Sequence, residues 1–343
     1  MSQTVRSMTL ASRPTGQPTA QNFALTETAM PEPAEGEVLV RVIWLSLDPY
    51  MRGRMDDAKS YAPPVEIGGI MEGGAVGEVI ASRHAGFSEG DIALGAFGWT
   101  SHAALPGDAL RKVDPAIAPI QTALGVLGMP GITAWVGVNR IIGIQQGETA
   151  LISAATGAVG TLAGQLAQIK GARAIGVAGG EEKCAYATSE LGYAACLDHK
   201  ALDAAGLKEA LAAAAPGGVD GYFENVGGKT LEAALSGMND HGRIALCGMI
   251  AWYSGRGLDE AMSLPAAWRA ILVKRLKVEG FIIFDHMHLY PEFLAEVAPM
   301  VKDGRIRYRE SIAEGLEAAP DAFISMLEGG NFGKQLVRVG DDP

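Results

Sequence analysis

This chain has few of the residues that mark disulfide-bonded or zinc-knuckle proteins. Its three cysteines, Cys184, Cys196 and Cys247, include no CxxC pair, so the sequence offers neither a disulfide framework nor the usual spacing of zinc-binding thiolates. Cysteine usage of this kind is typical of a reducing compartment, and we expect a cytoplasmic protein.

Positive charge is also scarce. The chain has 28 Lys and Arg residues against 39 Asp and Glu, which gives a formal net charge of -11. A nucleic-acid partner would require a basic face, and no basic run is present, so we expect no nucleic-acid binding. A hydrophobic content of 48% is typical of a globular protein, and 343 residues suggest two domains.

Long unbroken apolar runs are missing as well. Residues 115–139 and 149–169 are uncharged and long enough to cross a membrane. Proline and glycine interrupt the first stretch, and a glycine turn divides the second. Residues 1–16 lack the continuous apolar segment of a secretory signal. We therefore expect no membrane partner.

The sequence does contain a nucleotide-binding pattern. Thr149 to Ser153 reads as a buried strand, a glycine turn and a helix follow, and Ala172 to Ala178 reads as a second strand. Gly157 would let a pyrophosphate approach the backbone, and Gly160 would let the helix pack close to the strand. The six-residue glycine pattern would begin at residue 155, which is Ala, so its first glycine is missing. The turn residues predicted to contact a dinucleotide are Thr156, Gly157, Ala158 and Val159.

The end of the second strand indicates which dinucleotide binds. Enzymes that use NAD place an acidic residue about 20 positions after the glycines, where it binds the ribose 2′-hydroxyl. This chain has Gly179-Gly180 there and Lys183 just beyond, and a lysine can bind a 2′-phosphate. NADP(H) is therefore the predicted cofactor. In the alternative interpretation, Glu181 to Lys183 simply begin a solvated helix.

The chain is expected to alternate between two kinds of architecture. Residues 1–125 are rich in β signals, residues 126–305 read as parallel strands with crossover helices, and residues 306–343 are expected to return to the first domain. The predicted fold class is α/β, with a doubly wound parallel sheet. Its predicted strands are Thr149–Ser153, Ala172–Ala178, Ala194–Leu197, Asp220–Asn225, Arg243–Gly248 and Val278–Ile283.

Several motifs resemble one known group of enzymes. They are Leu47 to Arg52 (LDPYMR), Gly128 to Ala134 (GMPGITA), Glu224 to Gly228 (ENVGG) and Asn331 to Lys334 (NFGK). With the glycine turn, they resemble the medium-chain dehydrogenase/reductase superfamily, and within it the prostaglandin reductases, plant double-bond reductases and bacterial curcumin reductases. The resemblance implies a GroES-like catalytic domain, a Rossmann domain, and NADPH-dependent reduction of a carbon-carbon double bond conjugated to a carbonyl.

The resemblance also implies roles for individual residues. Met129 and Thr133 would flank the nicotinamide, and Lys183 would bind the 2′-phosphate. The Leu197-Asp198-His199 segment is similar to the curcumin-reductase branch. Asn225, whose position is also ordinary turn chemistry, and Asn331 would hold the dinucleotide. The further cofactor residues are Gly179, His199, Cys247, Gly248, Tyr253, Phe281, Ile282 and Gly333.

Zinc is not expected. Zinc-dependent relatives have a Cys shortly after the strand that here is Val38 to Val42, and a His in a Gly-His-Glu turn. This chain has Trp44 to Pro49 in the first place and Met71 before Glu72 in the second. With so few soft ligands, the enzyme should work without a metal.

Without a metal, an enone carbonyl must be polarised by hydrogen bonds while negative charge develops on it. A tyrosine with a pKa of about 10 stays protonated at neutral pH and can donate one. The candidate catalytic residues are Tyr50, Tyr61 and Tyr253, and the cofactor ribose hydroxyl is another donor. Each tyrosine could instead be a half-buried aromatic whose hydroxyl only reaches water.

The main prediction is a zinc-independent enone or enal reductase. A quinone reductase of the same superfamily and a non-catalytic NADP(H)-binding sensor or structural protein remain alternatives. The apolar segment Leu276 to Ile283 would be the last strand of its sheet, and such an edge favours pairing with a second copy. We therefore also expect a homodimer.

Overall fold

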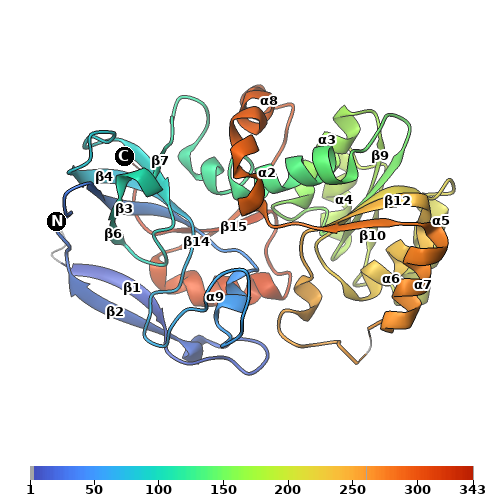
Figure 1. Cartoon of the computed structure of the whole chain (residues 1–343), viewed down its shortest axis with the longest axis horizontal. Helices are drawn as coiled ribbons and strands as arrows, with labels where there is room; N and C mark the ends of the chain where they lie inside the picture. The colour runs from blue at the N-terminus through green and yellow to red at the C-terminus, as the bar shows by residue number, and fades with distance from the viewer. Residues whose placement is uncertain (1–3, 260, 343) are drawn as a thin grey trace. The chain divides into compact units, whose positions relative to one another are not determined.

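The computed structural model describes residues 4–259 and 261–342 and divides the chain into two compact units. The first unit contains the described residues up to Gly125 and from Glu310 onward, and the second contains Val126–Arg309. The first unit contains two sheets and the second contains one (Figure 1), and each unit has its own apolar core. Among the described residues, no helix combines the length and the apolar composition needed to cross a membrane.

The first unit is built mainly from antiparallel strands. Strands β1 (Thr4–Leu10) and β2 (Phe23–Ala29) form a two-stranded sheet, and a second sheet has the order β14-β15-β3-β4-β5-β7, with β6 also paired to β3. The other strands are β3 (Glu37–Ser46), β4 (Ala75–Ser82), β5 (Ile92–Gly95), β6 (His102–Pro106), β7 (Arg111–Lys112), β14 (Glu310–Glu314) and β15 (Lys334–Arg338). Its helices are η1 (Ala20–Asn22), α1 (Met51–Arg54), η2 (Gly107–Ala109), η3 (Ile120–Leu124), η7 (Leu316–Ala318) and α9 (Ala319–Leu327).

Two distant parts of the first unit are joined by a buried ion pair. Strand β15 pairs antiparallel with β3, and Lys334 at its start donates to the Leu47 carbonyl at 2.6 Å and to Asp48 Oδ1 at 2.9 Å. Lys334 is 3% exposed, so its charge depends on Asp48 for compensation. The LDPYMR and NFGK segments are therefore neighbours in space.

The second unit contains one six-stranded parallel sheet in the order β10-β9-β8-β11-β12-β13. Counted along the chain within this sheet, the order is 3-2-1-4-5-6, which is that of doubly wound dinucleotide-binding folds. The predicted fold class is confirmed. The strands are β8 (Thr149–Ser153), β9 (Arg173–Ala178), β10 (Ala195–Asp198), β11 (Val219–Glu224), β12 (Met238–Leu246) and β13 (Lys277–Gly280).

Helices cover both faces of this sheet. Residues of α5 (Ala204–Ala214), α6 (Gly228–Gly237) and α7 (Leu264–Lys274) share one apolar cluster with the strands, and Figure 1 shows these helices together. The other helices are α2 (Met129–Val136), η4 (Gly137–Ile142), α3 (Gly160–Ile169), α4 (Glu181–Ser189), η5 (Ile250–Trp252), η6 (Ile283–Leu289) and α8 (Tyr290–Lys302).

The edge strand β13 is shorter than predicted. Its last pair joins Gly280 to Leu246, the final residue of β12, so the ladder ends where its partner strand ends. Phe281 and Ile282 lie beyond the strand, and Ile283 begins η6. These two residues therefore follow the carboxyl end of the sheet, where ligands of such folds bind.

Candidate functional site

The turn after β8 winds tightly around the carbonyl oxygen of Ala154. Ala154 has a positive φ of 49°, a conformation that side chains other than glycine rarely adopt. A Cβ on Gly160 would lie 2.2 Å from this oxygen, and one on Gly157 would lie 3.2 Å from it. Gly160 therefore cannot carry a side chain unless the turn moves, which confirms that close packing here requires a glycine.

The missing first glycine of the motif is compensated on the neighbouring strand. Ala155 is fully buried, and its Cβ lies 2.8 Å from the position of a Cβ on Gly176 of β9. A side chain at residue 155 fits because residue 176 has none. The glycine motif concerns consecutive residues only. It therefore does not show that Gly176 on β9 replaces the glycine that is missing at residue 155.

Tyr193 fixes the first turn of α3 and was not predicted from the sequence. Its buried hydroxyl donates to the Gly160 carbonyl at 2.7 Å. Its ring packs against Gly164, where an added Cβ would lie only 2.1 Å from Tyr193 Cζ. The helix N-terminus is thereby held against the sheet, in the position where the backbone N–H groups of such folds bind phosphate.

Basic side chains converge at the carboxyl ends of β9 and β10. A Cβ on Gly179 would lie 2.9 Å from His199 Nε2 and 3.0 Å from Lys200 Cε. Asp198 Oδ1 accepts from the Gly180 N–H at 2.7 Å and from the Lys200 N–H at 2.8 Å, which holds the two strand ends together. The absence of a side chain at Gly179 thus lets His199 and Lys200 approach the end of β9. We call Lys183, His199, Lys200 and Lys229 the basic cradle, because their charges act on one another.

Basic groups from neighbouring elements act on one another in this cradle. Burial lowers the pKa of Lys183 on α4, and the positive charge of Lys200 lowers it further. The pKa of His199 is lowered first by burial and next by Lys229; Asp198 opposes this, and Lys200 and Lys183 lower it further. Mutual repulsion of this kind is relieved by a bound anion. The chemistry of the cradle therefore fits a phosphate, and Lys200 and Lys229 are members that sequence reasoning missed.

Asn225 joins β8 to the turn after β11. Its backbone N–H donates to Ser153 Oγ at 2.7 Å, and its Nδ2 donates to the Ser153 carbonyl at 2.9 Å. Glu224 is fully buried. Its carboxylate accepts from the Gly227 N–H at 3.0 Å and from the Tyr222 hydroxyl at 2.8 Å, and the first of these bonds closes the same turn. The amide of Asn225 thus has the structural role that turn chemistry suggests, at the switch point between the two halves of the sheet.

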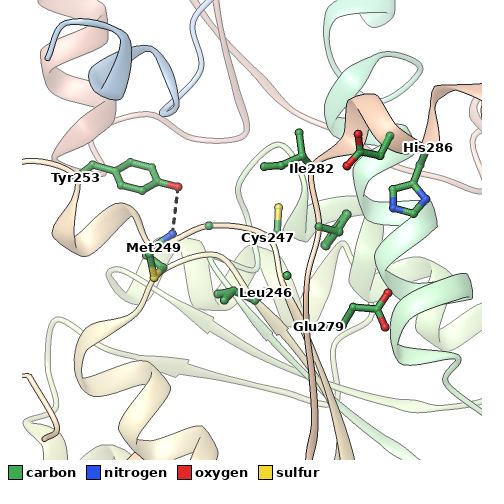
Figure 2. Close-up of a pocket in the computed structure, with 11 residues that line it drawn as sticks. Leu246, Cys247, Met249, Tyr253, Glu279, Ile282 and His286 are labelled. Carbon is green, nitrogen blue, oxygen red and sulfur yellow. Dashed lines mark hydrogen bonds between the residues drawn. The ribbon is translucent and has the colours of Figure 1, made fainter. Parts of the chain in front are cut away.

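A pocket of about 420 Å³ opens at the carboxyl ends of β12 and β13. Tyr253 extends over Gly248, and its hydroxyl accepts a hydrogen bond from the Met249 N–H at 3.1 Å (Figure 2). Burial raises the pKa of Cys247 to about 12, so this thiol is protonated at neutral pH. The lining residues are Leu246, Cys247, Gly248, Met249, Tyr253, Glu279, Gly280, Phe281, Ile282, Asp285 and His286.

Five predicted cofactor residues therefore meet in one pocket. They are Cys247, Gly248, Tyr253, Phe281 and Ile282. Met249, Glu279, Asp285 and His286 also line this pocket. Figure 2 shows Tyr253 and His286 on opposite sides of this pocket. Met129 and Thr133 lie elsewhere in the second unit, on α2, where Thr133 Oγ1 donates to the Met129 carbonyl at 2.7 Å.

Four predicted site residues, Tyr50, Tyr61, Asn331 and Gly333, belong to the first unit. Burial raises the pKa of Tyr50, and the nearby Asp48 raises it further, so this phenol stays neutral. The guanidinium carbon of Arg54 lies 4.2 Å from the ring centre of Tyr61 and 5.8 Å from that of Tyr50. Asn331 Nδ2 donates to the Gly333 carbonyl at 2.7 Å.

Metal ligands do not gather anywhere in the described part of the chain. Residues 4–259 and 261–342 contain no group of three or more His, Cys, Asp or Glu side chains that could hold a metal ion.

The two units correspond to two known family models. Residues 6–113 match the model described as the N-terminal domain of oxidoreductase, and residues 158–299 match the one described as zinc-binding dehydrogenase. Together with the doubly wound sheet, they define the architecture of the medium-chain dehydrogenase/reductase superfamily.

Comparison with individual proteins shows which group within this superfamily the chain is similar to. The NADPH-dependent curcumin reductase of Escherichia coli (strain K12) is 48% identical over 98% of this chain and 98% of its own. The 2-alkenal reductase (NADP(+)-dependent) of Nicotiana tabacum is 39% identical over 88% of this chain and 87% of its own. The crystal structure of CurA in complex with NADPH from Vibrio vulnificus, 48% identical, has a TM-score of 0.93 and covers 98% of this chain and 100% of that one. The chain belongs to this family of reductases and is an oxidoreductase.

Proposed function

We propose that this protein uses NADPH to reduce the carbon-carbon double bond of α,β-unsaturated ketones or aldehydes. The observation that carries the proposal is the basic cradle at Gly179, where Lys183, His199 and Lys200 lie near one another and suit the 2′-phosphate that distinguishes NADPH from NADH. The names of the relatives support it, since they include an NADPH-dependent curcumin reductase and a 2-alkenal reductase.

The cofactor would be held at three places in the second unit. Lys183, His199 and Lys200 would bind the 2′-phosphate, and the turn from Thr156 to Val159 would bind the pyrophosphate. The pocket with Tyr253 would receive the nicotinamide end. We retain Met129, Thr133, Asn225, Asn331 and Gly333 as proposed cofactor contacts on the strength of the family resemblance.

When bound, NADPH supplies a hydride, and the protein must stabilise the negative charge that then develops on the substrate oxygen. The candidate donors are the phenols of Tyr50, Tyr61 and Tyr253. Burial keeps the Tyr50 phenol neutral, so it can donate a hydrogen bond throughout the physiological pH range.

The test is NADPH oxidation by chelator-treated protein with a panel of enones, enals and quinones, repeated with NADH. Products are identified by mass spectrometry. A saturated ketone or aldehyde, formed faster with NADPH, is the expected result. Quinol as the sole product would favour a quinone reductase, and tight NADPH binding without turnover would favour a sensor or structural protein.

We also propose that a second copy of the chain covers α7 and β13. Leu264, Trp268 and Leu272 recur every fourth residue of α7 and are 67%, 59% and 77% exposed, and Val278 on the edge strand is 41% exposed. An apolar helix face beside an edge strand suits a continuous sheet across a two-fold axis. Light scattering at micromolar concentration should give a dimer, and Leu272→Asp should give a monomer. A monomeric parent protein would contradict this proposal.

A further inference from the structure

An arginine is buried between two of the candidate catalytic tyrosines. Arg54, the last residue of α1, is 2% exposed. Its guanidinium carbon lies 4.2 Å from the ring centre of Tyr61 and 5.8 Å from that of Tyr50. Cations within about 6 Å of an aromatic ring are attracted to its face. One charged group therefore contacts both rings.

Burying this charge requires compensation, and the structure provides it. Arg54 Nε lies 2.6 Å from Glu72 Oε1, an ion pair that is not aligned as a hydrogen bond. Arg54 Nη1 donates to the Ala62 carbonyl at 2.9 Å. If residue 54 served only to fill space, an apolar side chain would do so without the desolvation cost of a guanidinium. The position thus uses the geometry and charge of arginine.

The same residue anchors the segment that carries Tyr61. Residues 55–66 form no helix or strand, so few regular backbone hydrogen bonds hold them. Arg54 contacts this segment through its carbonyl, which accepts from Val65 N–H at 2.8 Å, through the Ala62 carbonyl and through the Tyr61 ring. Tyr61 is 52% exposed, and the Arg54 guanidinium packs against its ring.

We propose that Arg54 is a positioning residue, which holds the rings of Tyr50 and Tyr61 in the arrangement that binds the enone substrate. This inference deepens the proposed function and rests on it. Arg54 acts through the tyrosines and makes no contribution to cofactor binding. Lysine would keep the charge but not the planar fork that contacts Glu72 and Ala62 together.

The kinetic test compares Arg54→Met and Arg54→Lys with Arg52→Met. Arg52 is the matched control, because it lies on the same helix, is 3% exposed, and has Gly16 and Asp56 as its partners. Arg54→Met should lower kcat/KM for the enone about tenfold at unchanged NADPH affinity, and Arg54→Lys should restore part of it. An equal loss in Arg52→Met would indicate general destabilisation and overturn the proposal.

A double-mutant cycle with Tyr61→Leu provides the second kinetic readout. If Arg54 acts through the Tyr61 ring, adding Arg54→Met to Tyr61→Leu should cost much less than it does in the parent protein. Fully additive losses would contradict a positioning role.

A readout without turnover separates this inference from the proposed function. In protein labelled with 3-fluorotyrosine, Arg54→Met should shift the ¹⁹F resonances of Tyr50 and Tyr61, assigned with Tyr50→Phe and Tyr61→Phe, and Arg52→Met should leave them in place. Unmoved resonances would refute the positioning role even in an active enzyme. Shifted resonances in a protein that reduces no enone would refute the proposed function instead.

Discussion

Gly176 on β9 faces Ala155 in the turn after β8, and a Cβ on Gly176 would lie 2.8 Å from the Cβ of Ala155. A glycine expected in the turn is thus replaced by a glycine on the adjacent strand. Gly176→Ala should destabilise the protein by about 1–3 kcal/mol, because the fully buried Ala155 cannot move aside without disturbing the turn. Urea unfolding measures this cost.

The double variant Ala155→Gly with Gly176→Ala should recover part of the loss. Recovery should be incomplete, since the new Cβ would also lie 3.1 Å from Cys196 Sγ. Gly217→Ala is the control, because a Cβ there meets nothing within 4 Å. Strictly additive costs of the two changes would show that residues 155 and 176 are not coupled.

The basic cradle predicts how the enzyme selects its cofactor. Lys183→Met and Lys200→Met should each raise the Kd for NADPH about tenfold and change the Kd for NADH by less than about twofold, because only NADPH carries the 2′-phosphate. Fluorescence titration of the reduced cofactors provides both constants. The exposed Lys170→Met, at the end of α3, is the control and should change neither. If the variants weaken the binding of NADPH and NADH equally, the 2′-phosphate does not bind in this cradle.

Removing one hydroxyl at a time distinguishes the catalytic roles of the three candidate tyrosines. Tyr50→Phe, Tyr61→Phe and Tyr253→Phe retain the ring and lose the donor, so a residue that stabilises the developing enolate should lower kcat about 10–100-fold. Binding of NADPH should stay within about twofold of the parent in Tyr50→Phe. Stopped-flow measurement of hydride transfer gives the chemical step directly. Full activity in Tyr50→Phe and Tyr253→Phe would exclude both as proton or hydrogen-bond donors.

The sequence predicted most strongly the features that depend on local pattern. The strand from Thr149 to Ser153 is reproduced residue for residue, since an apolar run bounded by a glycine turn leaves little choice of ends. The end of β13 was misjudged because apolar residues continue to Ile283 although the partner strand stops at Leu246. The length over which two strands pair depends on both strands, so the composition of one strand does not determine it.

Contacts between distant residues were beyond the sequence for the same reason. Lys183 was found by its spacing from the glycine turn, but Lys200 belongs to the cradle only because β10 pairs with β9. Arg54 likewise lies only four residues after Tyr50 in sequence, but its contact with the Tyr61 ring depends on the path of residues 55–66. The glycine motif indicates residues close to it in the sequence. The order of strands in the sheet determines which residues of the next strand also reach the site.

The ion pair between Glu148 and Arg243 predicts how stability depends on pH. Arg243 Nη1 lies 2.9 Å from Glu148 Oε1, and Arg243 Nε donates to the Ile142 carbonyl at 2.8 Å. This hydrogen-bonded pair lowers the pKa of Glu148. A carboxyl whose pKa is lower in the folded than in the unfolded state stabilises the fold above its usual pKa of about 4.3, and loses that contribution as the pH falls through the folded value.

Glu148→Gln should therefore cost about 1–2 kcal/mol at pH 7, and the difference from the parent protein should shrink steadily below about pH 4. Urea unfolding at a series of pH values measures it. Glu292→Gln is the control, because its pair with Arg140 is 45–53% exposed and exposed pairs contribute less than about 1 kcal/mol. A constant difference between pH 7 and pH 3 would show that Glu148 stabilises the fold through packing and not through its charge.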